Sequence, residues 1–522
     1  MPLRTTIDHA RHAVFWPPAA ILLAALVASI VNFEGFVAVM RAANDAYIER
    51  FGPAVALCAF AAVVLITIVF LSPLGRIRIG GAQATPLLPR WNLFAITLCT
   101  TIATGILFWG AAEPMYHVTD PPAFAGVDGD RDAAARFALS SIFLHWSITP
   151  YAIYTVCSLA FALSRYNLGG SFSLSAPLQA LIGKRAEGWP SATLDALALF
   201  ALVAGVCASL SAGVLTLVGG LGKVLGVESS PAVSAGVTAL ITAAFVASSV
   251  SGLQRGIRIL SDWNVRVFFL LCGFVFVAGP TLGMLDLGAK SLFDYGREFV
   301  SRSLGLNGGL NDPWTRDWAS FQFSVWLAWA PITAMFLGRI GVGYSVREFV
   351  LFNLVWPAAF SIVWMTVFAG GALITDAQTG GALATALREV GPEAVIYALL
   401  DTLPFTGIVI VIFIGATFIS FVTAMDSNTE AISNVTLQTD APDRASLFIK
   451  IVWGALIGAV SWIMTATTGV DGIRLLGNLG GAPGLLVLSV SAAVLVRLVV
   501  SPARARVERG PSEQAERAPE PA

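Results

Sequence analysis

The chain has 522 residues, of which 56% are hydrophobic and 12% are charged, and its formal net charge is −1. A soluble domain carries about 25% charged residues, so this composition indicates a polytopic membrane protein. The near-neutral charge excludes a nucleic-acid partner, and the sequence shows no nucleophile–base pair, metal cluster or phosphate loop that would point to an enzyme.

Apolar runs of about 20 residues or more mark the predicted membrane spans. They fall near residues 17–40, 51–72, 91–112, 138–163, 192–220, 232–251, 263–285, 317–338, 350–373, 404–427, 446–468 and 475–499. The sequence therefore predicts an all-α polytopic membrane protein with twelve transmembrane helices.

Basic residues gather in alternate loops, and acid-rich loops at 113–136 and 374–401 fall on the opposite side. The basic set is Arg4, Arg11, Arg76, Arg78, Arg90, Lys184, Arg185, Arg255, Arg258, Arg339, Arg347, Arg504, Arg506 and Arg509. Because short cytoplasmic loops are enriched in Lys and Arg, this pattern predicts a multi-pass protein of the cell (inner) membrane with both termini in the cytoplasm.

The third span is rich in threonine and glycine and closes on Glu113-Pro114. The eighth span likewise holds polar residues and Pro331. Polar and helix-weakening residues at matched places fit an inverted-repeat transporter with broken helices, and ordinary small-residue helix packing is the alternative. Glu113 and Asp426 are the ionisable residues nearest the middle of the bundle, where such groups mark function. Structural roles, as a helix end and a helix cap, are the alternative.

The fourth span reads LHWSITPYAIY from Leu144 to Tyr154. Tyr151 and Tyr154 are i,i+3 neighbours, and Trp146 lies two turns before Tyr154 on roughly the same side. Pro150 frees a backbone carbonyl and is expected to kink the helix between them. The neighbouring His145 is interpreted as a packing histidine, with a proton relay as the alternative.

Two connections are predicted to be ordered, and the C-terminal tail is predicted to be disordered. Residues 286–304 predict an amphipathic helix along the outer surface, and residues 376–399 predict an ordered outer loop. The tail from Ser501 is rich in Pro, Glu and Arg, so we expect it to be disordered.

The stretch from Asp317 to Pro331, DWASFQFSVWLAWAP, is dense in aromatic residues. An interfacial belt with helix packing would explain it. A second aromatic cluster on the fourth span favours two aromatic helices that face each other. Facing rings form a box that attracts an organic cation such as a trimethylammonium group, and each ring contributes roughly 0.5–2 kcal/mol when water is excluded.

From about Phe15 to Val500 the chain resembles the betaine/choline/carnitine transporter family. The resemblance is carried by FWPP at 15–18, GRIRIGG at 75–81, GILFWGAAEP at 105–114, HWSITPYAIY at 145–154, SGLQRGIRILSDWN at 251–264, the aromatic stretch continuing to WAPITAMFLGRI at 329–340, REF at 347–349 and FVTAMDS at 421–427. It implies a leucine-transporter-like fold with two inverted repeats. The implied parts are an N-terminal region (1–90), the first repeat (91–285), the surface helix (286–304), the second repeat (317–499) and a cytoplasmic tail (500–522).

The resemblance also implies the substrate site. Trp146, Tyr151, Tyr154 and Trp326 match the cage that holds the substrate's ammonium group, and Trp329 and Phe321 match residues lining the pathway. Tyr151 stands where the family usually has Trp, so its extra hydroxyl needs a partner. Phe323 and Val325 replace two family tryptophans, a change expected to reshape the site.

The family's ion sites match less well. Its glycine-rich unwound segment corresponds to TIATG, where backbone carbonyls near Ile102 and Gly105 are candidate ligands. Thr423 is kept at the second sodium site but is followed by Ala424. Glu113 and Asp426 are candidates for proton coupling. The resemblance thus implies no cofactor beyond a sodium ion or a proton as the coupling ion.

The function implied is a secondary active transporter that takes up a betaine-like or quaternary-ammonium compound, such as glycine betaine, choline, carnitine or a related zwitterion, by ion-coupled alternating access. The alternatives are an ion-independent substrate/product exchanger and a non-transporting solute sensor. The expected partners are the small zwitterionic or cationic solute and the lipid bilayer. Family members are often trimers, so a homotrimer is the implied assembly.

Overall fold

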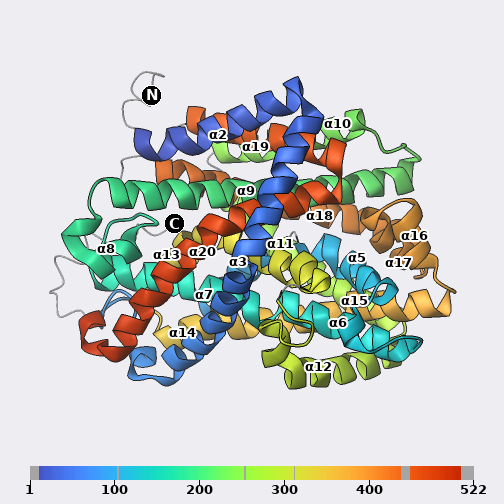
Figure 1. Ribbon diagram of the computed structural model, residues 1–522, viewed down its shortest axis with the longest axis horizontal. Helices are drawn as coiled ribbons and strands as arrows, with labels where there is room; N and C mark the ends of the chain where they lie inside the picture. The colour runs from blue at the N-terminus through green and yellow to red at the C-terminus, as the bar shows by residue number, and fades with distance from the viewer. Residues whose placement is uncertain (1–10, 103–104, 252–253, 311, 437–446, 507–522) are drawn as a thin grey trace.

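The computed structural model describes residues 11–102, 105–251, 254–310, 312–436 and 447–506 (Figure 1). Within these ranges the regular structure is helical, with one isolated β-bridge between Arg78 and Ser345. Nine of the described helices are long and apolar enough to cross a membrane, or up to eleven if each of two bent helix pairs counts as one span. The all-α polytopic fold is confirmed, whereas the predicted number of twelve spans is not reproduced exactly.

The boundaries of the first predicted span, 17–40, are wrong, because the helix is interrupted at Asn32. Helix α2 (His12–Val31) ends before Asn32, and α3 (Phe33–Leu71) begins after it. The Asn32 side chain accepts a hydrogen bond from the backbone N–H of Gly35 at 3.0 Å, which satisfies a donor that the first turn leaves open. Helix α3 then runs for 39 residues, through the predicted loop and the second span.

The longer helices of the first half follow in order. They are α4 (Arg90–Ile102), α5 (Gly105–Thr119), α6 (Arg131–Trp146), α7 (Ile148–Ala162), α9 (Trp189–Leu225), α10 (Pro231–Ser251) and α11 (Gln254–Ala278). The predicted fourth span is therefore two helices, α6 and α7, that meet at Ser147. The junction between α4 and α5, where unwinding was expected, lies outside the described residues.

The second half is built from a similar series. It comprises η5 (Thr315–Ser320), α13 (Phe321–Ile340), α14 (Val346–Val350), η6 (Leu351–Val355), α15 (Trp356–Gln378), α18 (Thr406–Thr436), α19 (Leu447–Thr468) and α20 (Val470–Val500). The eighth span bends by 55° between the segments that end at Pro331 and begin at Thr333, because Pro331 has no N–H for the helix ladder. This agrees with the expected broken helix, and the inverted-repeat relationship stays a prediction.

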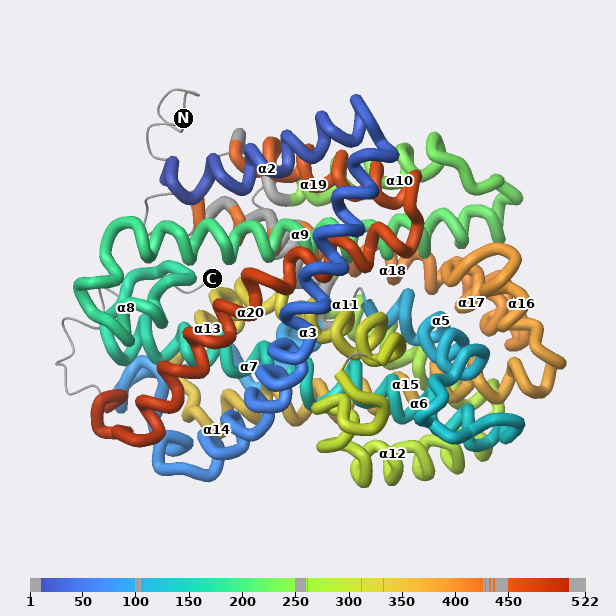
Figure 2. Tube along the Cα trace, viewed as in Figure 1, coloured from blue at the N-terminus to red at the C-terminus, as the bar shows by residue number. Residues whose placement is uncertain are grey.

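Short helices connect the spans. They are η1 (Pro73–Arg76), η2 (Ala123–Ala125), η3 (Leu163–Asn167), α8 (Ala176–Ile182), η4 (Gly183–Ala186), α16 (Ala382–Glu389), α17 (Pro392–Asp401) and η8 (Pro502–Ala505). Figure 2 traces how these turns link the long helices of the bundle.

Helix α13 lies at the centre, in contact with α20, α7 and α9. A glycine stripe on α20 permits this packing: a Cβ at Gly481 would lie 2.6 Å from the Cβ of Ser324, and one at Gly484 would lie 2.2 Å from the backbone oxygen of Leu327. Small residues let two membrane helices approach backbone to backbone. The tryptophans of the central stretch are consequently 4–7% exposed, so they face protein rather than forming an interfacial belt.

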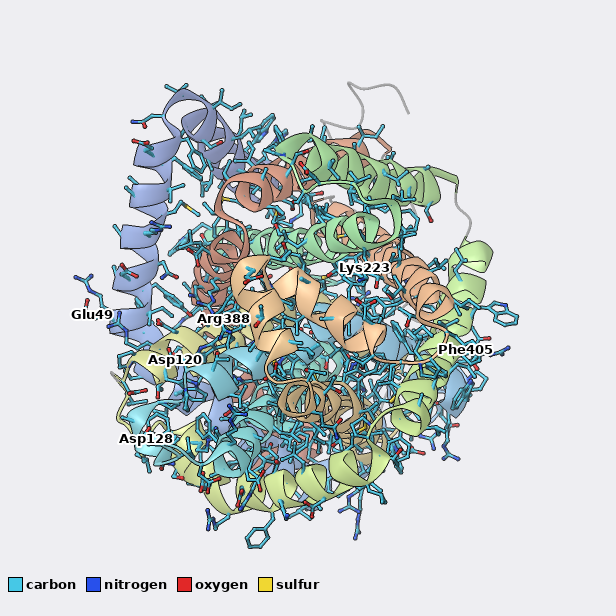
Figure 3. The ribbon with its side chains drawn as sticks, turned by 90° about the vertical axis from the view of Figure 1, so that its right-hand side faces the viewer. Glu49, Asp120, Asp128, Lys223, Arg388 and Phe405 are labelled. Atoms are coloured by element: carbon cyan, nitrogen blue, oxygen red, sulfur yellow. The ribbon has the colours of Figure 1, made fainter. Side chains whose placement is uncertain are left out.

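One end of the bundle carries the predicted surface helix and the predicted ordered loop. Helix α12 (Thr281–Ser303) leaves the preceding helix at 106° and begins five residues earlier than predicted. Its position along the membrane surface stays a prediction. Residues 376–399 fold largely into the end of α15, into α16 and into α17. Figure 3 looks onto this end, with Asp120, Asp128 and Arg388 labelled on its surface.

The basic loops meet at the other end. Asn167 donates to the carbonyl oxygens of Arg78 at 3.1 Å and Ala505 at 2.8 Å. The tail predicted to be disordered from Ser501 is therefore structured in its first residues, since Pro502–Ala505 forms a short helix whose last residue is buried. The remainder, 507–522, lies outside the described residues.

Candidate functional site

Four aromatic side chains meet in the interior around Trp326 of α13. Its ring centroid lies 5.0 Å from that of Tyr154. The corresponding distances are 5.4 Å to Trp146 and 5.8 Å to Tyr151. All four side chains are at most 5% exposed. The structure thus brings together the predicted group, which we call the cage, while its role in binding stays a prediction.

The break at Ser147 positions three of these rings. Ser147 has φ −119° and ψ −112°, so the chain leaves helical geometry between Trp146 and the two tyrosines of α7. The break falls three residues before Pro150, whose missing N–H would have paired with the carbonyl of Trp146. The His145 carbonyl next to the break instead accepts the Trp326 Nε1–H at 3.0 Å, which joins α6 to α13.

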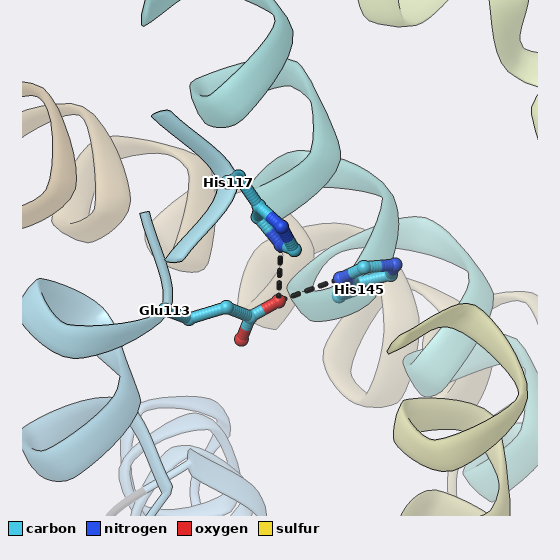
Figure 4. A group of neighbouring side chains, drawn as sticks. All are labelled: Glu113, His117 and His145. Carbon is cyan, nitrogen blue, oxygen red and sulfur yellow. Dashed lines mark hydrogen bonds and ion pairs between the residues drawn. The ribbon is translucent and has the colours of Figure 1, made fainter. Parts of the chain in front are cut away.

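Glu113 is fully buried behind the cage, where its carboxylate accepts four hydrogen bonds. Oε1 lies 2.6 Å from Nδ1 of His145 and 3.3 Å from Nε2 of His117 (Figure 4). Oε2 accepts from Nε1 of Trp146 and from Nε2 of Gln322, each at 2.7 Å. Residues from α5, α6 and α13 therefore surround one carboxylate, and one of its donors is a cage ring.

The donor pattern fixes the tautomers of the two histidines. Trp314 Nε1, which can only donate, lies 3.1 Å from His117 Nδ1, so the hydrogen of a neutral His117 is on Nε2. An ionised Glu113 can only accept, so His145 donates through Nδ1, and its buried Nε2 has no hydrogen-bonding partner among the described residues. The ligand atoms of the trio lie within 4.8 Å of one another, yet the nitrogens that face Glu113 carry hydrogens. The arrangement is a hydrogen-bond network around an anion rather than a metal centre.

A buried arginine lies one layer further out. Arg302, near the end of α12, donates to Ser140 Oγ at 2.7 Å and to Ser141 Oγ. Its Cζ lies 4.6 Å from the ring centroid of Phe137 and 5.8 Å from that of Trp314. Arg302 therefore anchors α12 to α6. Trp314, which contacts both Arg302 and His117, connects Arg302 to the Glu113 network.

The two residues expected to line the pathway lie on either side of the cage. Phe321 is 1% exposed, and its ring centroid is 5.9 Å from that of Trp109 on α5. Trp329 is one turn beyond Trp326 and faces α9, where its Cδ1 is 3.1 Å from the position of a Cβ on Gly205. Phe321 thus packs against α5, and Trp329 lies at the α13–α9 contact.

The two positions that depart from the family pattern lie behind the cage. Phe323 is fully buried, with its ring centroid 6.3 Å from that of His145. Val325 faces the glycine stripe of α20, because a Cβ on Gly477 would lie 2.5 Å from its Cγ2. These substitutions therefore shape the supports of the cage. The hydroxyl of Tyr151 is buried and faces the side chain of Thr101.

Besides Glu113, two of the predicted ion-coupling residues have described contacts, Gly105 and Thr423. Gly105 gives room to the cage, since a Cβ there would lie 2.5 Å from Cη2 of Trp146. The Thr423 hydroxyl donates to two carbonyls of its own helix, at 2.9 and 3.1 Å. The side chains of Ile102 and Asp426 lie outside the described part of the structure.

The sequence did not single out His117, Gln322 or Trp314. A signal for His117 was present, because it is i+4 from Glu113 and hence on the same helix face. Gln322 was noted as a polar residue of the eighth span, but nothing indicated which atom it would meet. Trp314 precedes the aromatic stretch and gave no signal.

Comparison with known proteins gives one family over nearly the whole chain. Residues 13–503 match the model described as betaine/carnitine/choline family transporter. The matched region includes every residue of the cage and of the Glu113 network.

Curated relatives cover the chain almost as fully. An ectoine/hydroxyectoine transporter of Virgibacillus pantothenticus is 30% identical over 86% of this chain and 89% of its own length. The glycine betaine transporter 1 of Vibrio parahaemolyticus is 31% identical over 77% of each chain. The glycine betaine transporter OpuD of Bacillus subtilis is 27% identical over 92% of this chain and 93% of its own.

Proposed function

This chain belongs to the betaine/carnitine/choline transporter family, and on that basis we propose that it takes up a betaine-like or quaternary-ammonium solute by ion-coupled secondary transport. The observation that carries the proposal is the cage. Ring faces attract an ammonium group whose methyl substituents prevent hydrogen bonding. The relatives' names, which include glycine betaine and ectoine, support a solute from the small zwitterions and quaternary ammonium compounds.

The transport cycle we propose is alternating access around the cage. The cage is closed in this structure, because its rings contact one another and are almost completely buried. Opening on either side requires the broken elements, α6–α7 at Ser147 and α13 at Pro331, to move. The charge distribution of the loops supports cytoplasmic termini in the cell membrane, so uptake starts from the end that carries α12, α16 and α17.

For the coupling ion we propose a proton. Four donors bind the Glu113 carboxylate, so among the described residues the basic atom of the network left without a partner is Nε2 of His145. A proton added there gives an imidazolium beside the carboxylate, and the net charge of the buried group changes from −1 to zero. The network bonds to Trp146 and, through the His145 carbonyl, to Trp326. Proton occupancy is thereby linked to cage geometry.

Other charged groups face this network from the elements around it. They are Arg302 on α12, one layer beyond Trp314, and Arg474 on α20, beside Trp318. Sodium is the alternative coupling ion, and its candidate ligands are the backbone near Ile102 and the Thr423 hydroxyl. Because sodium needs a shell of oxygen ligands, Ala424 following Thr423 weakens that alternative.

Purified protein in proteoliposomes tests the function. A thermal-shift screen first identifies the solute, since a ligand that binds the folded state raises its stability. Uptake of that solute is then measured with an inward sodium gradient, an inward proton gradient, or counter-substrate alone. We expect accumulation with the proton gradient. Accumulation with sodium alone overturns proton coupling. Uptake with counter-substrate alone identifies an exchanger, binding without uptake identifies a sensor, and no binding by any betaine-like solute overturns the function.

A further inference from the structure

Arg474, the fifth residue of α20, lies against three aromatic rings near the ends of α5 and η5. Its Cζ is 4.6 Å from the ring centroid of Trp318. It is 5.7 Å from that of Phe321 and 5.9 Å from that of Tyr116. Cation–π attraction operates within about 6 Å. The guanidinium therefore occupies an aromatic box, and we call Tyr116, Trp318 and Phe321 the outer box.

The outer box lies beyond the cage along α13. Trp109 connects two of its members, with its ring centroid 6.1 Å from that of Trp318 and 5.9 Å from that of Phe321. Phe321 precedes Trp326 on α13 by five residues, a rise of about 7.5 Å. A solute that enters from this end of the bundle meets Arg474 first and the cage second.

Arg474 has no carboxylate partner of its own. No carboxylate oxygen of a described residue lies within 4.0 Å of its guanidinium nitrogens, and its Nε is buried without a hydrogen bond. Asp317 acts on it at longer range and is shared with Arg316. Asp471, one turn away, pairs with Arg41 at 3.6 Å. The other acids that face this region are Asp45, Asp312 and Glu393.

A guanidinium with unfilled donors is a strong partner for a carboxylate, because its planar fork makes two parallel charge-assisted hydrogen bonds. A zwitterion such as glycine betaine presents a carboxylate as well as a quaternary ammonium group. A cation such as choline presents the ammonium group alone. We infer that Arg474 selects zwitterions over cations by binding the substrate carboxylate at the outer box.

This inference rests on the proposed function of the cage and orders the first steps of binding. The carboxylate pairs with Arg474 and draws the guanidinium off the ring faces. The exposed rings then receive the ammonium group, which moves from there to the cage around Trp326. A cation without a carboxylate cannot pair with Arg474. It is repelled by the guanidinium, which still occupies the outer box.

The test compares two solutes that differ mainly at one end. Binding of glycine betaine and of choline to the purified full-length protein is measured by tryptophan fluorescence, and uptake of both is measured in proteoliposomes. The variants are Arg474→Gln, which removes the charge, and Arg474→Lys, which keeps the charge without the fork. Arg41→Gln is the control, because it removes the exposed positive charge on α3 that pairs with Asp471 and for which no contact with a ring of the outer box is recorded among the described residues.

We expect Arg474→Gln to raise the Kd for glycine betaine about tenfold or more, the size of one lost charge-assisted hydrogen bond. The Kd for choline stays constant or falls, so the preference for the zwitterion shrinks by at least that factor. Arg474→Lys raises the Kd for glycine betaine less, and Arg41→Gln changes neither value. An unchanged ratio of the two Kd values in Arg474→Gln, or an equal loss of both affinities, overturns the inference.

Folding is checked by gel filtration. If Arg474→Gln does not fold, the ratio of Kd values in Arg474→Lys decides, since a lysine lacks bidentate geometry; a wild-type ratio there also overturns the inference. Failure of the proposed function is separate: in that case the wild-type protein binds and transports neither solute. Wild-type protein that binds glycine betaine, together with an Arg474→Gln variant of unchanged preference, rejects the role of Arg474 alone.

Discussion

The Nε1–H of Trp146 is donated to Oε2 of Glu113 at 2.7 Å, while the ring of the same residue faces Trp326 in the cage. One side chain therefore belongs to both the aromatic site and the buried carboxylate network. Movement of the Trp146 ring breaks a hydrogen bond to an anion, and such bonds contribute about 1.5–3 kcal/mol each. A shift of the Trp146 ring would therefore also change the hydrogen bonding of Glu113.

Removal of the central ring of the cage is expected to abolish transport. Trp326→Ala eliminates the side chain that contacts three other rings and the His145 carbonyl. Uptake in proteoliposomes should fall to background while gel filtration shows a folded protein. Trp356→Ala is the control, because this indole is 52% exposed on the outside of the bundle. Wild-type uptake by the Trp326 variant would contradict the cage.

A methyl group at Gly105 is expected to disturb the cage without unfolding the helix. The new Cβ would lie 2.5 Å from Cη2 of Trp146, and that ring cannot swing away without losing Glu113. We expect Gly105→Ala to raise KM at least about tenfold, which corresponds to 1.4 kcal/mol.

The control for that variant is on the same helix. A Cβ at Gly110 would meet its nearest neighbour, Trp364 Nε1, at 3.5 Å, an ordinary contact. Gly110→Ala should therefore transport normally. Equal KM values for the two variants would show that Trp146 has more freedom than its contacts indicate.

Replacement of His145 should separate coupling from binding. His145→Asn retains an N–H close to the position of Nδ1, so the bond to Glu113 can persist, but it removes the open nitrogen that we propose accepts the proton. We expect exchange of labelled for unlabelled solute to continue, while accumulation driven by a proton gradient is lost. Proton-driven accumulation at the wild-type level would place the coupling site elsewhere.

Arg302 is expected to contribute to stability rather than to binding. Arg302→Ala removes hydrogen bonds to two serines and the contact with Phe137, so we expect a loss of about 2–3 kcal/mol. Thermal unfolding in detergent measures this as a lower midpoint temperature. Arg297→Ala, on the same helix but 61% exposed in its side chain, should change the midpoint little. Equal midpoints for the two variants would argue against the anchoring role of Arg302.

The sequence alone determined that the chain is a helical membrane protein and where its aromatic residues concentrate. Apolar runs and turn residues are local signals, so most spans, a helix over residues 286–304 and order within residues 376–399 could be predicted. The boundaries predicted for 17–40 were wrong, because hydropathy alone does not reveal a helix that ends and restarts at one capping residue, here Asn32. The cage could also be proposed from the sequence, because Trp146, Tyr151 and Tyr154 are close neighbours on one segment.

Only the tertiary structure decided what surrounds Glu113 and Arg474. Gln322 is 209 residues from Glu113 in the sequence, and Trp314 is 197 residues from His117. Whether such groups meet depends on how each helix is rotated about its axis, and apolar composition on every face does not fix that rotation. Close contact between α13 and the glycine stripe of α20 fixes it here. That contact turns Gln322 toward the carboxylate and brings Arg474 onto the ring of Trp318.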